Sequence, residues 1–146
     1  MIVLAATVAG GVLLVGKQKP SQLKVQGTFT ISNKSYDPTN DFADPNFRGD
    51  DIGGCQGASG YDDLNSITQV VVTNSQAQEI ARTELGSGSE DGDGTQKSDT
   101  CTFTFNFAVR KGSPYYVVSV GDRGSSQYTF DELKTPGVVG LIIGNT

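Results

Sequence analysis

The chain has 146 residues and a formal net charge of −5, with no histidine and two cysteines. The negative charge, with Lys and Arg scattered rather than clustered, argues against a nucleic-acid partner, because phosphates require a basic face. Without histidine the usual general base and both the Ser–His and Cys–His nucleophile pairs are missing. We therefore expect a protein that is not an enzyme and that carries no cofactor.

The first element is Met1–Gly16, an uncharged and mostly apolar run. A membrane span takes about 20 apolar residues and at least roughly 17, whereas a signal-peptide core needs about 7 to 15. Sixteen residues fall between the two, and the basic segment that should precede either is missing, as it would be if the natural chain began further upstream. We expect residues 1–19 to form a membrane anchor with residues 2–16 in the bilayer. A cleaved signal and a buried strand or helix are the alternatives.

Residues 20–146 are enough for one domain, and their Gly, Val, Thr and aromatic content favours strands. Leu23–Ser32 alternates apolar and polar residues, which predicts a half-buried strand. Asn33–Gly60 is rich in Asp, Asn, Pro and Gly and is predicted to be a long, partly ordered loop. Ile67–Asn74 and Glu79–Leu85 are predicted to be two strands of a hairpin. Gly86–Asp99 has no apolar residue, which predicts an exposed loop.

The clearest alternation in the chain is Cys101–Val109, where a cysteine, three phenylalanines and a valine share one face. Tyr115–Val120 and Gln127–Phe130 are two further strands, and Asp131–Lys134 is predicted to form one helical turn. Val138–Ile143 is predicted to be a last, well-buried strand. The fold class is therefore all-β: an immunoglobulin-like Greek-key sandwich of seven to eight strands, preceded by one transmembrane helix.

The two cysteines are Cys55 and Cys101, and an even count in an exported domain predicts a disulfide between them. Two free buried thiols in a cytoplasmic protein are the alternative. A structural zinc site is not expected, because two cysteines without histidine cannot complete its four ligands.

Residues 53–133 carry sequence motifs that are similar to those of a known group of proteins. These are a Gly-Tyr-x-Asp step, a Thr-Gln-Val strand, a Cys-x-Phe-x-Phe strand, an Arg-Gly turn, a tyrosine strand and a Glu-Leu step. The residues that match are Gly60, Tyr61, Asp62, Thr68, Gln69, Val70, Cys101, Phe103, Phe105, Val120, Arg123, Gly124, Tyr128, Glu132 and Leu133. The chain thus resembles small exported actinobacterial proteins of uncharacterised function. The resemblance implies an exported, disulfide-linked β domain on a membrane tether, and it assigns no activity to the chain.

Four residues are predicted to form a partner-binding face: Tyr61, Tyr116, Arg123 and Tyr128. Tyrosine and arginine are enriched at the centres of interfaces, because they combine apolar area with a polar group. The alternative is that the tyrosines only pack in the core or on the sheet, as most strand tyrosines do.

Acidic residues suggest two weaker kinds of site. Asp91 and Asp93 alternate with glycine like the start of a calcium loop, but the later positions lack the remaining ligands. The aspartate pairs at 50–51 and 62–63 could serve a hydrolase as acid and base, although Gly-rich wet segments offer nothing that would raise a pKa. We expect solvated loops at both places.

These expectations combine into one function. The chain is predicted to be a single-pass protein of the cell membrane whose domain lies on the extracytoplasmic side. It would act as a non-enzymatic interaction module and an accessory subunit that binds membrane proteins of a larger complex. The alternative is a secreted or cell-wall domain that binds glycan or calcium. Lys17 and Lys19 argue weakly for the opposite orientation, because positive flanks favour the cytoplasm.

Overall fold

The computed structural model describes residues 21–32, 46–50, 52–91 and 100–144. It contains ten strands and one short helix in these residues. They are β1 (Gln22–Ser32), β2 (Phe47–Gly49), β3 (Gly54–Gly57), β4 (Gln69–Asn74), β5 (Glu79–Glu84), β6 (Gly88–Asp91), β7 (Thr100–Arg110), β8 (Tyr116–Val120), β9 (Ser125–Tyr128), α2 (Phe130–Leu133) and β10 (Gly140–Ile143).

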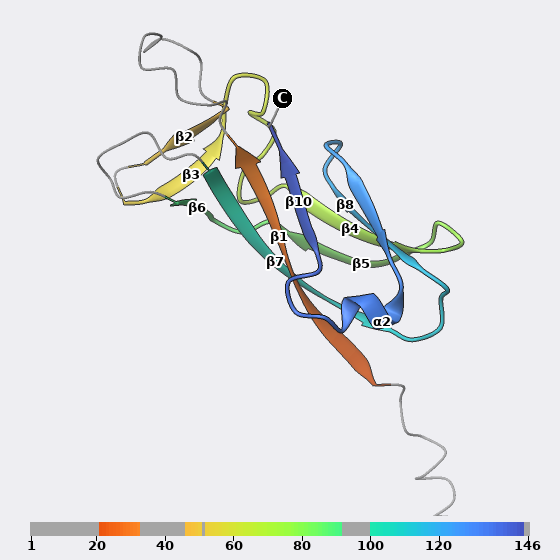
Figure 1. Cartoon of the computed structure of the whole chain (residues 1–146). Coiled ribbons are helices and arrows are strands. Elements are labelled where there is room, and N and C mark those ends of the chain that lie inside the picture. Colours follow the sequence, from red (N-terminus) through yellow and green to blue (C-terminus); the bar gives the residue numbers. More distant parts are fainter. Residues whose placement is uncertain (1–20, 33–45, 51, 92–99, 145–146) are drawn as a thin grey trace, which may run out of the picture.

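The strands form two sheets around one core (Figure 1). The larger sheet has six strands in the order β10-β1-β7-β6-β3-β2, and it is mixed because β10 runs parallel to β1. The smaller sheet is antiparallel, in the order β5-β4-β8-β9. The mostly β architecture predicted from the sequence is confirmed, but the described residues hold ten strands instead of seven to eight.

The additional strands come from segments that the sequence analysis assigned to loops. β2 and β3 pair as a hairpin inside the predicted loop 33–60, and β6 lies inside the predicted loop 86–99. β6 bonds to β3 on one side and to β7 on the other. These strands are short and rich in glycine and polar residues, so backbone pairing rather than an apolar pattern identifies them.

Other predicted elements agree with the structure to within a few residues. β4 and β5 form the predicted hairpin, and α2 is the predicted helical turn. A capping box starts α2: the Thr129 side chain accepts a bond from the Glu132 amide, and the Glu132 carboxylate accepts one from the Thr129 amide. The prediction of a well-buried last strand is wrong in part. β10 is a sheet edge, and the side chain of Ile142 is 69% exposed.

The predicted anchor, residues 1–19, lies outside the described residues. Among the residues that are described, no helix has the length and apolar character needed to cross a membrane.

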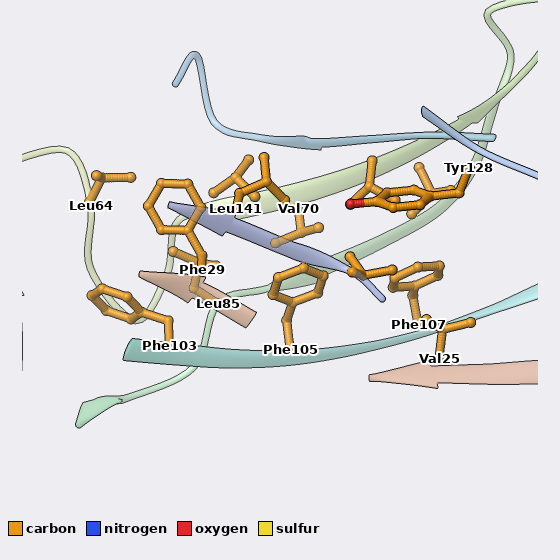
Figure 2. Close-up of a cluster of buried hydrophobic side chains, with 14 of the residues drawn as sticks. Val25, Phe29, Leu64, Val70, Leu85, Phe103, Phe105, Phe107, Tyr128 and Leu141 are labelled. Atoms are coloured by element: carbon orange, nitrogen blue, oxygen red, sulfur yellow. The ribbon is translucent and has the colours of Figure 1, made fainter. Parts of the chain in front are cut away.

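The core is built on the pairing of β1 with β7, whose eleven residue pairs run from Gln22–Arg110 to Ser32–Thr100. The odd-numbered residues of both strands face inward, so Phe29 lies opposite Phe103 and both are fully buried. Figure 2 shows Phe105 and Phe107 of β7 pointing toward Val70 and Tyr128 of the smaller sheet, with Phe103 on the side of Phe29 and Leu64. The predicted phenylalanine face of β7 is therefore confirmed as the core.

Gly27 is the one inward-facing residue of β1 without a side chain. It lies opposite Phe105, and a Cβ at position 27 would fall 2.3 Å from the Phe105 ring carbon Cζ. The ring therefore occupies the space that any other residue's side chain would need, which explains a glycine in the middle of a long strand.

Cys55 and Cys101 form the predicted disulfide, with 6.0 Å between their Cα atoms. They belong to β3 and β7, which are separated by β6 in the sheet. Two strands with one strand between them lie roughly 10 Å apart in a flat sheet, so this sheet must curl tightly at β6. Gly88 of β6 permits the approach, because a Cβ there would lie 2.4 Å from the Cys55 carbonyl oxygen and 3.0 Å from the Cys101 sulfur.

We expect Gly27→Ala to lower the free energy of unfolding by about 1–3 kcal/mol, because the added methyl overpacks a core that cannot move Phe105 aside. Urea denaturation measures this. Gly140→Ala is the matched control, since the nearest atom to its Cβ, Thr28 Oγ1, is at an ordinary 3.5 Å. Equal stability of the two variants would contradict the packing of Phe105 over Gly27.

We expect reduction of the disulfide to lower the free energy of unfolding by roughly 2–4 kcal/mol, because the bridge closes a loop of 46 residues. Thermal melting with and without dithiothreitol measures the loss, and intact mass should rise by two hydrogen atoms. The double variant Cys55→Ala/Cys101→Ala should melt at one temperature in both buffers. A wild-type melting temperature that is the same with and without the reductant would contradict the prediction.

Candidate functional site

The loop between β3 and β4, residues 58–68, is held by hydrogen bonds of its own. The Thr68 hydroxyl donates to the Asp63 carbonyl oxygen and accepts from the Asn65 amide. Leu64 is fully buried in the core and anchors the loop from below. The loop is therefore fixed to the domain by its own hydrogen bonds and by Leu64, and Ile67 on it is 67% exposed.

The turn between β8 and β9 lies beside this loop. The Gly121 amide donates to the Gln69 carbonyl oxygen over 2.8 Å, and a Cβ on Gly121 would be 3.3 Å from Thr68. Gly121 has a φ of 47°, in the left-handed region that favours glycine. This turn places Arg123 over residues 60–63, about sixty positions earlier in the chain.

Arg123 joins the two segments through hydrogen bonds, an ion pair and a cation–π contact. Its Nε donates to both carboxylate oxygens of Asp63, at 3.2 and 2.9 Å, and one terminal nitrogen donates to Asp63 and to the Gly60 carbonyl oxygen. The guanidinium carbon lies 5.0 Å from the centre of the Tyr61 ring, a cation–π contact. We call Tyr61, Asp63 and Arg123, together with Ile67 four positions after Asp63 in the same loop, the distal cluster.

The electrostatics of the distal cluster are those of a stable ion pair. The hydrogen bond from Arg123 lowers the pKa of Asp63 below its ordinary value of 3.8, although partial burial opposes the shift. The same hydrogen bond raises the pKa of Arg123. The side chains of Arg123 and Asp63 are still 30% and 49% exposed, so a partner could reach both.

Of the four residues of the predicted partner-binding face, only Tyr61 and Arg123 reach the surface. The structure brings Tyr61 and Arg123 together, but Tyr116 and Tyr128 are core residues. The Tyr116 hydroxyl donates to the Arg110 carbonyl oxygen, so its polar atom is also used internally. The prediction that these two tyrosines contact a partner is therefore corrected, because strand alternation turns both inward.

The predicted acidic sites do not come together in the described residues. Asp91 is the exposed last residue of β6, while Asp93 and Asp51 lie outside the described residues. Among those that are described, no group of three or more Asp, Glu or Cys side chains could hold a metal ion.

The other two aspartates shape their own loops. The Asp50 carboxylate accepts bonds from the Ile52 and Gly54 amides, and the Asp62 carboxylate accepts one from the Gly60 amide. The lowered pKa of Asp63 keeps its carboxyl group ionised near pH 7, whereas a general acid must be protonated there.

Sequence reasoning missed the role of Asp63 and the exposure of Ile67. No local pattern pairs Asp63 with Arg123, since the contact depends on the fold. Several residues of the motif pattern also serve the structure: Gly60 has a φ of 96°, Glu132 caps α2, and Leu133 is buried.

Comparison of the chain with protein-family models, with curated proteins and with solved structures finds no match. The site must therefore be interpreted from its own chemistry.

We expect Asp63→Asn to cost roughly 0.5–1 kcal/mol at pH 7, because the pair is half exposed to solvent. The carboxyl has a lowered folded-state pKa, so its stabilising effect is complete above about pH 4 and is lost as the pH falls through that pKa. The stability difference between wild type and variant should therefore vanish in acid. Urea titrations between pH 2.5 and 7 test this, with Asp122→Asn on the same turn as control. A difference that grows toward low pH would refute the assignment.

Proposed function

We propose that this protein is a non-enzymatic interaction module, held at the extracytoplasmic face of the cell membrane as an accessory subunit of a larger membrane complex. In this proposal residues 1–19 form one transmembrane helix, and the domain is a β-sandwich of the immunoglobulin-like Greek-key type, as in the exported actinobacterial group that the motifs resemble. The disulfide supports the extracytoplasmic placement, because disulfides persist in oxidising compartments and are rare in the cytosol.

The observation that carries the proposal is the preordered distal cluster. Two loops that are distant in sequence are fixed to one another by Arg123, so a partner that bound here would not have to order them. The cluster offers an aromatic ring, a partly exposed arginine and an exposed isoleucine. These residue types supply much of the binding energy at protein interfaces, with a central apolar contact and a polar rim.

The position of the distal cluster also suits a partner other than the membrane. It lies at the end of the sandwich opposite the start of β1, where the chain arrives from the predicted anchor (Figure 1). β1 has eleven residues and so spans roughly 35 Å. On a tethered domain the cluster would therefore stand well clear of the bilayer and face a neighbouring protein.

We expect Ile67→Asp to reduce partner recovery at least roughly tenfold, because a buried unpaired carboxylate at an interface costs more than about 1.4 kcal/mol. The full chain with a C-terminal tag is purified from membranes in mild detergent, and copurifying proteins are quantified by mass spectrometry. Ile142→Asp is the matched control, since it places the same change at a side chain of similar exposure, 69% against 67%, on another surface.

Two outcomes would contradict this proposal. One is a chain that is recovered alone, and the other is a set of partners that both variants retain equally. Intact mass and melting temperature of each variant show that loss of partners is not loss of the fold.

A further inference from the structure

The described domain leaves most of its unpaired basic side chains at one end. Arg82, Arg123 and Lys134 form ion pairs with Glu79, Asp63 and Asp131. The basic side chains without an ion pair or a hydrogen bond among the described residues are Lys24, Arg48, Arg110 and Lys111. All but Arg48 belong to the end of the sandwich where β1 begins and β7 finishes.

The strand register fixes this placement. Gln22, the first residue of β1, pairs with Arg110, the last residue of β7, and Lys24 pairs with Ala108 on the next rung of the same outward face. Lys111 follows at once in the turn to β8. We call Lys24, Arg110 and Lys111 the basic end; in Figure 1 it lies where β1 starts, near α2.

The acidic residues near the basic end offset only part of its charge. Asp131 binds the Lys134 ammonium at 2.8 Å and also feels the charge of Lys111, while Glu132 keeps its charge although its carboxylate accepts the Thr129 amide. Lys24, Arg110, Lys111 and Lys134 still outnumber these two carboxylates. The opposite end of the sandwich carries the exposed carboxylates of Asp50, Asp62, Asp91 and Asp122. The domain is therefore acidic overall but has a positive pole.

The sequence sets how far the basic end can be from the predicted membrane segment. Residues 17–20 separate the apolar run from Ser21, and they include two more lysines. A fully extended chain rises at most about 3.6 Å per residue, so Ser21 lies within roughly 18 Å of the end of that run. If the run is in the bilayer, the basic end is the part of the domain that the chain holds nearest to the headgroups.

A hollow of about 320 Å³ opens at this end, and Arg110 is among its lining residues. The hydroxyl groups of Ser113 and Tyr116, which line it, are used inside the protein. The Ser113 hydroxyl donates to the Tyr115 carbonyl oxygen, and the Tyr116 hydroxyl accepts from the Ser113 amide and donates to the Arg110 carbonyl oxygen. What remains for a ligand is the Gln22 amide and the positive charge of Arg110, and charge attracts anions without choosing among headgroups.

We propose that the basic end docks on the anionic headgroups of the bilayer that holds the anchor, so that the domain stands upright with the distal cluster directed away. The occupant is a lipid surface of negative charge rather than one particular lipid. Lys and Arg near an anionic membrane each contribute to binding, so the three cations of the basic end would add to one another there. This inference rests on the proposed membrane tether.

The test uses the full chain in lipid nanodiscs that carry a headgroup quencher, and it exploits the absence of tryptophan from the sequence. Pro114→Trp places a single fluorophore in the exposed turn beside Lys111, and Ser125→Trp places one at the opposite end. We expect quenching of Trp at 114 to rise several-fold when phosphatidylglycerol replaces a third of the phosphatidylcholine. Quenching at 125 should stay low in both. Phosphatidylserine should act like phosphatidylglycerol.

Charge variants identify the cause. In the Pro114→Trp chain, Lys24→Gln, Arg110→Gln and Lys111→Gln together should abolish the increase, and so should 1 M salt, which shortens the screening length to about 3 Å. Arg48→Gln, which removes an unpaired cation elsewhere, should leave it intact. An unchanged increase in the triple variant, or an increase with one anionic lipid alone, would overturn the inference.

The experiment distinguishes failure of the proposed membrane anchor from failure of the proposed docking. If the anchor is absent, the chain does not float with nanodiscs of either composition, and the proposed function fails with it. If the chain floats with both but Trp at 114 is quenched equally in both, the tether stands and the docking of the basic end is refuted.

Discussion

The in-register pairing of β1 with β7 is the constraint on which the rest of the molecule depends. Eleven consecutive residue pairs fix which side chains face inward, and they place Gly27 under the Phe105 ring, where no larger residue would fit. A slip of one residue would turn the whole phenylalanine face to solvent. The same pairing gives the domain its long axis, because one end carries the start of β1 and the other carries the β3–β6–β7 corner.

The disulfide stabilises the corner formed by β3, β6 and β7. It joins β3 to β7 across β6, and the glycine at position 88 lets the sheet curl tightly enough for the bond. The short strands β2, β3 and β6 bury few apolar side chains, so the covalent link compensates for what packing does not supply there. The loop after β3 is then held in place, which lets Arg123 reach Asp63.

The two proposals describe opposite ends of one object. The distal cluster is neutralised within itself and offers aromatic, aliphatic and polar contacts, which suits a protein partner. The basic end offers little but charge, which suits a headgroup surface. A rigid body of two sheets between them would present the cluster at a fixed height above a membrane, so orientation and recognition would depend on each other. In these proposals membrane attachment and partner recognition would lie at opposite ends of the strands.

The sequence by itself determined the strands whose alternation is strong, the β4–β5 hairpin, the turn of α2, the core face of β7 and the cysteine pair. Periodicity suffices there, because burial on one face repeats every second residue. Tertiary structure alone decided the rest. β6 is a strand because its neighbours bond to it. Tyr116 and Tyr128 are buried because the inner face of the smaller sheet, to which both belong, packs on the shared core. Arg123 meets Asp63 because two turns converge. These features depend on contacts between distant segments, and no local pattern of residues encodes such contacts.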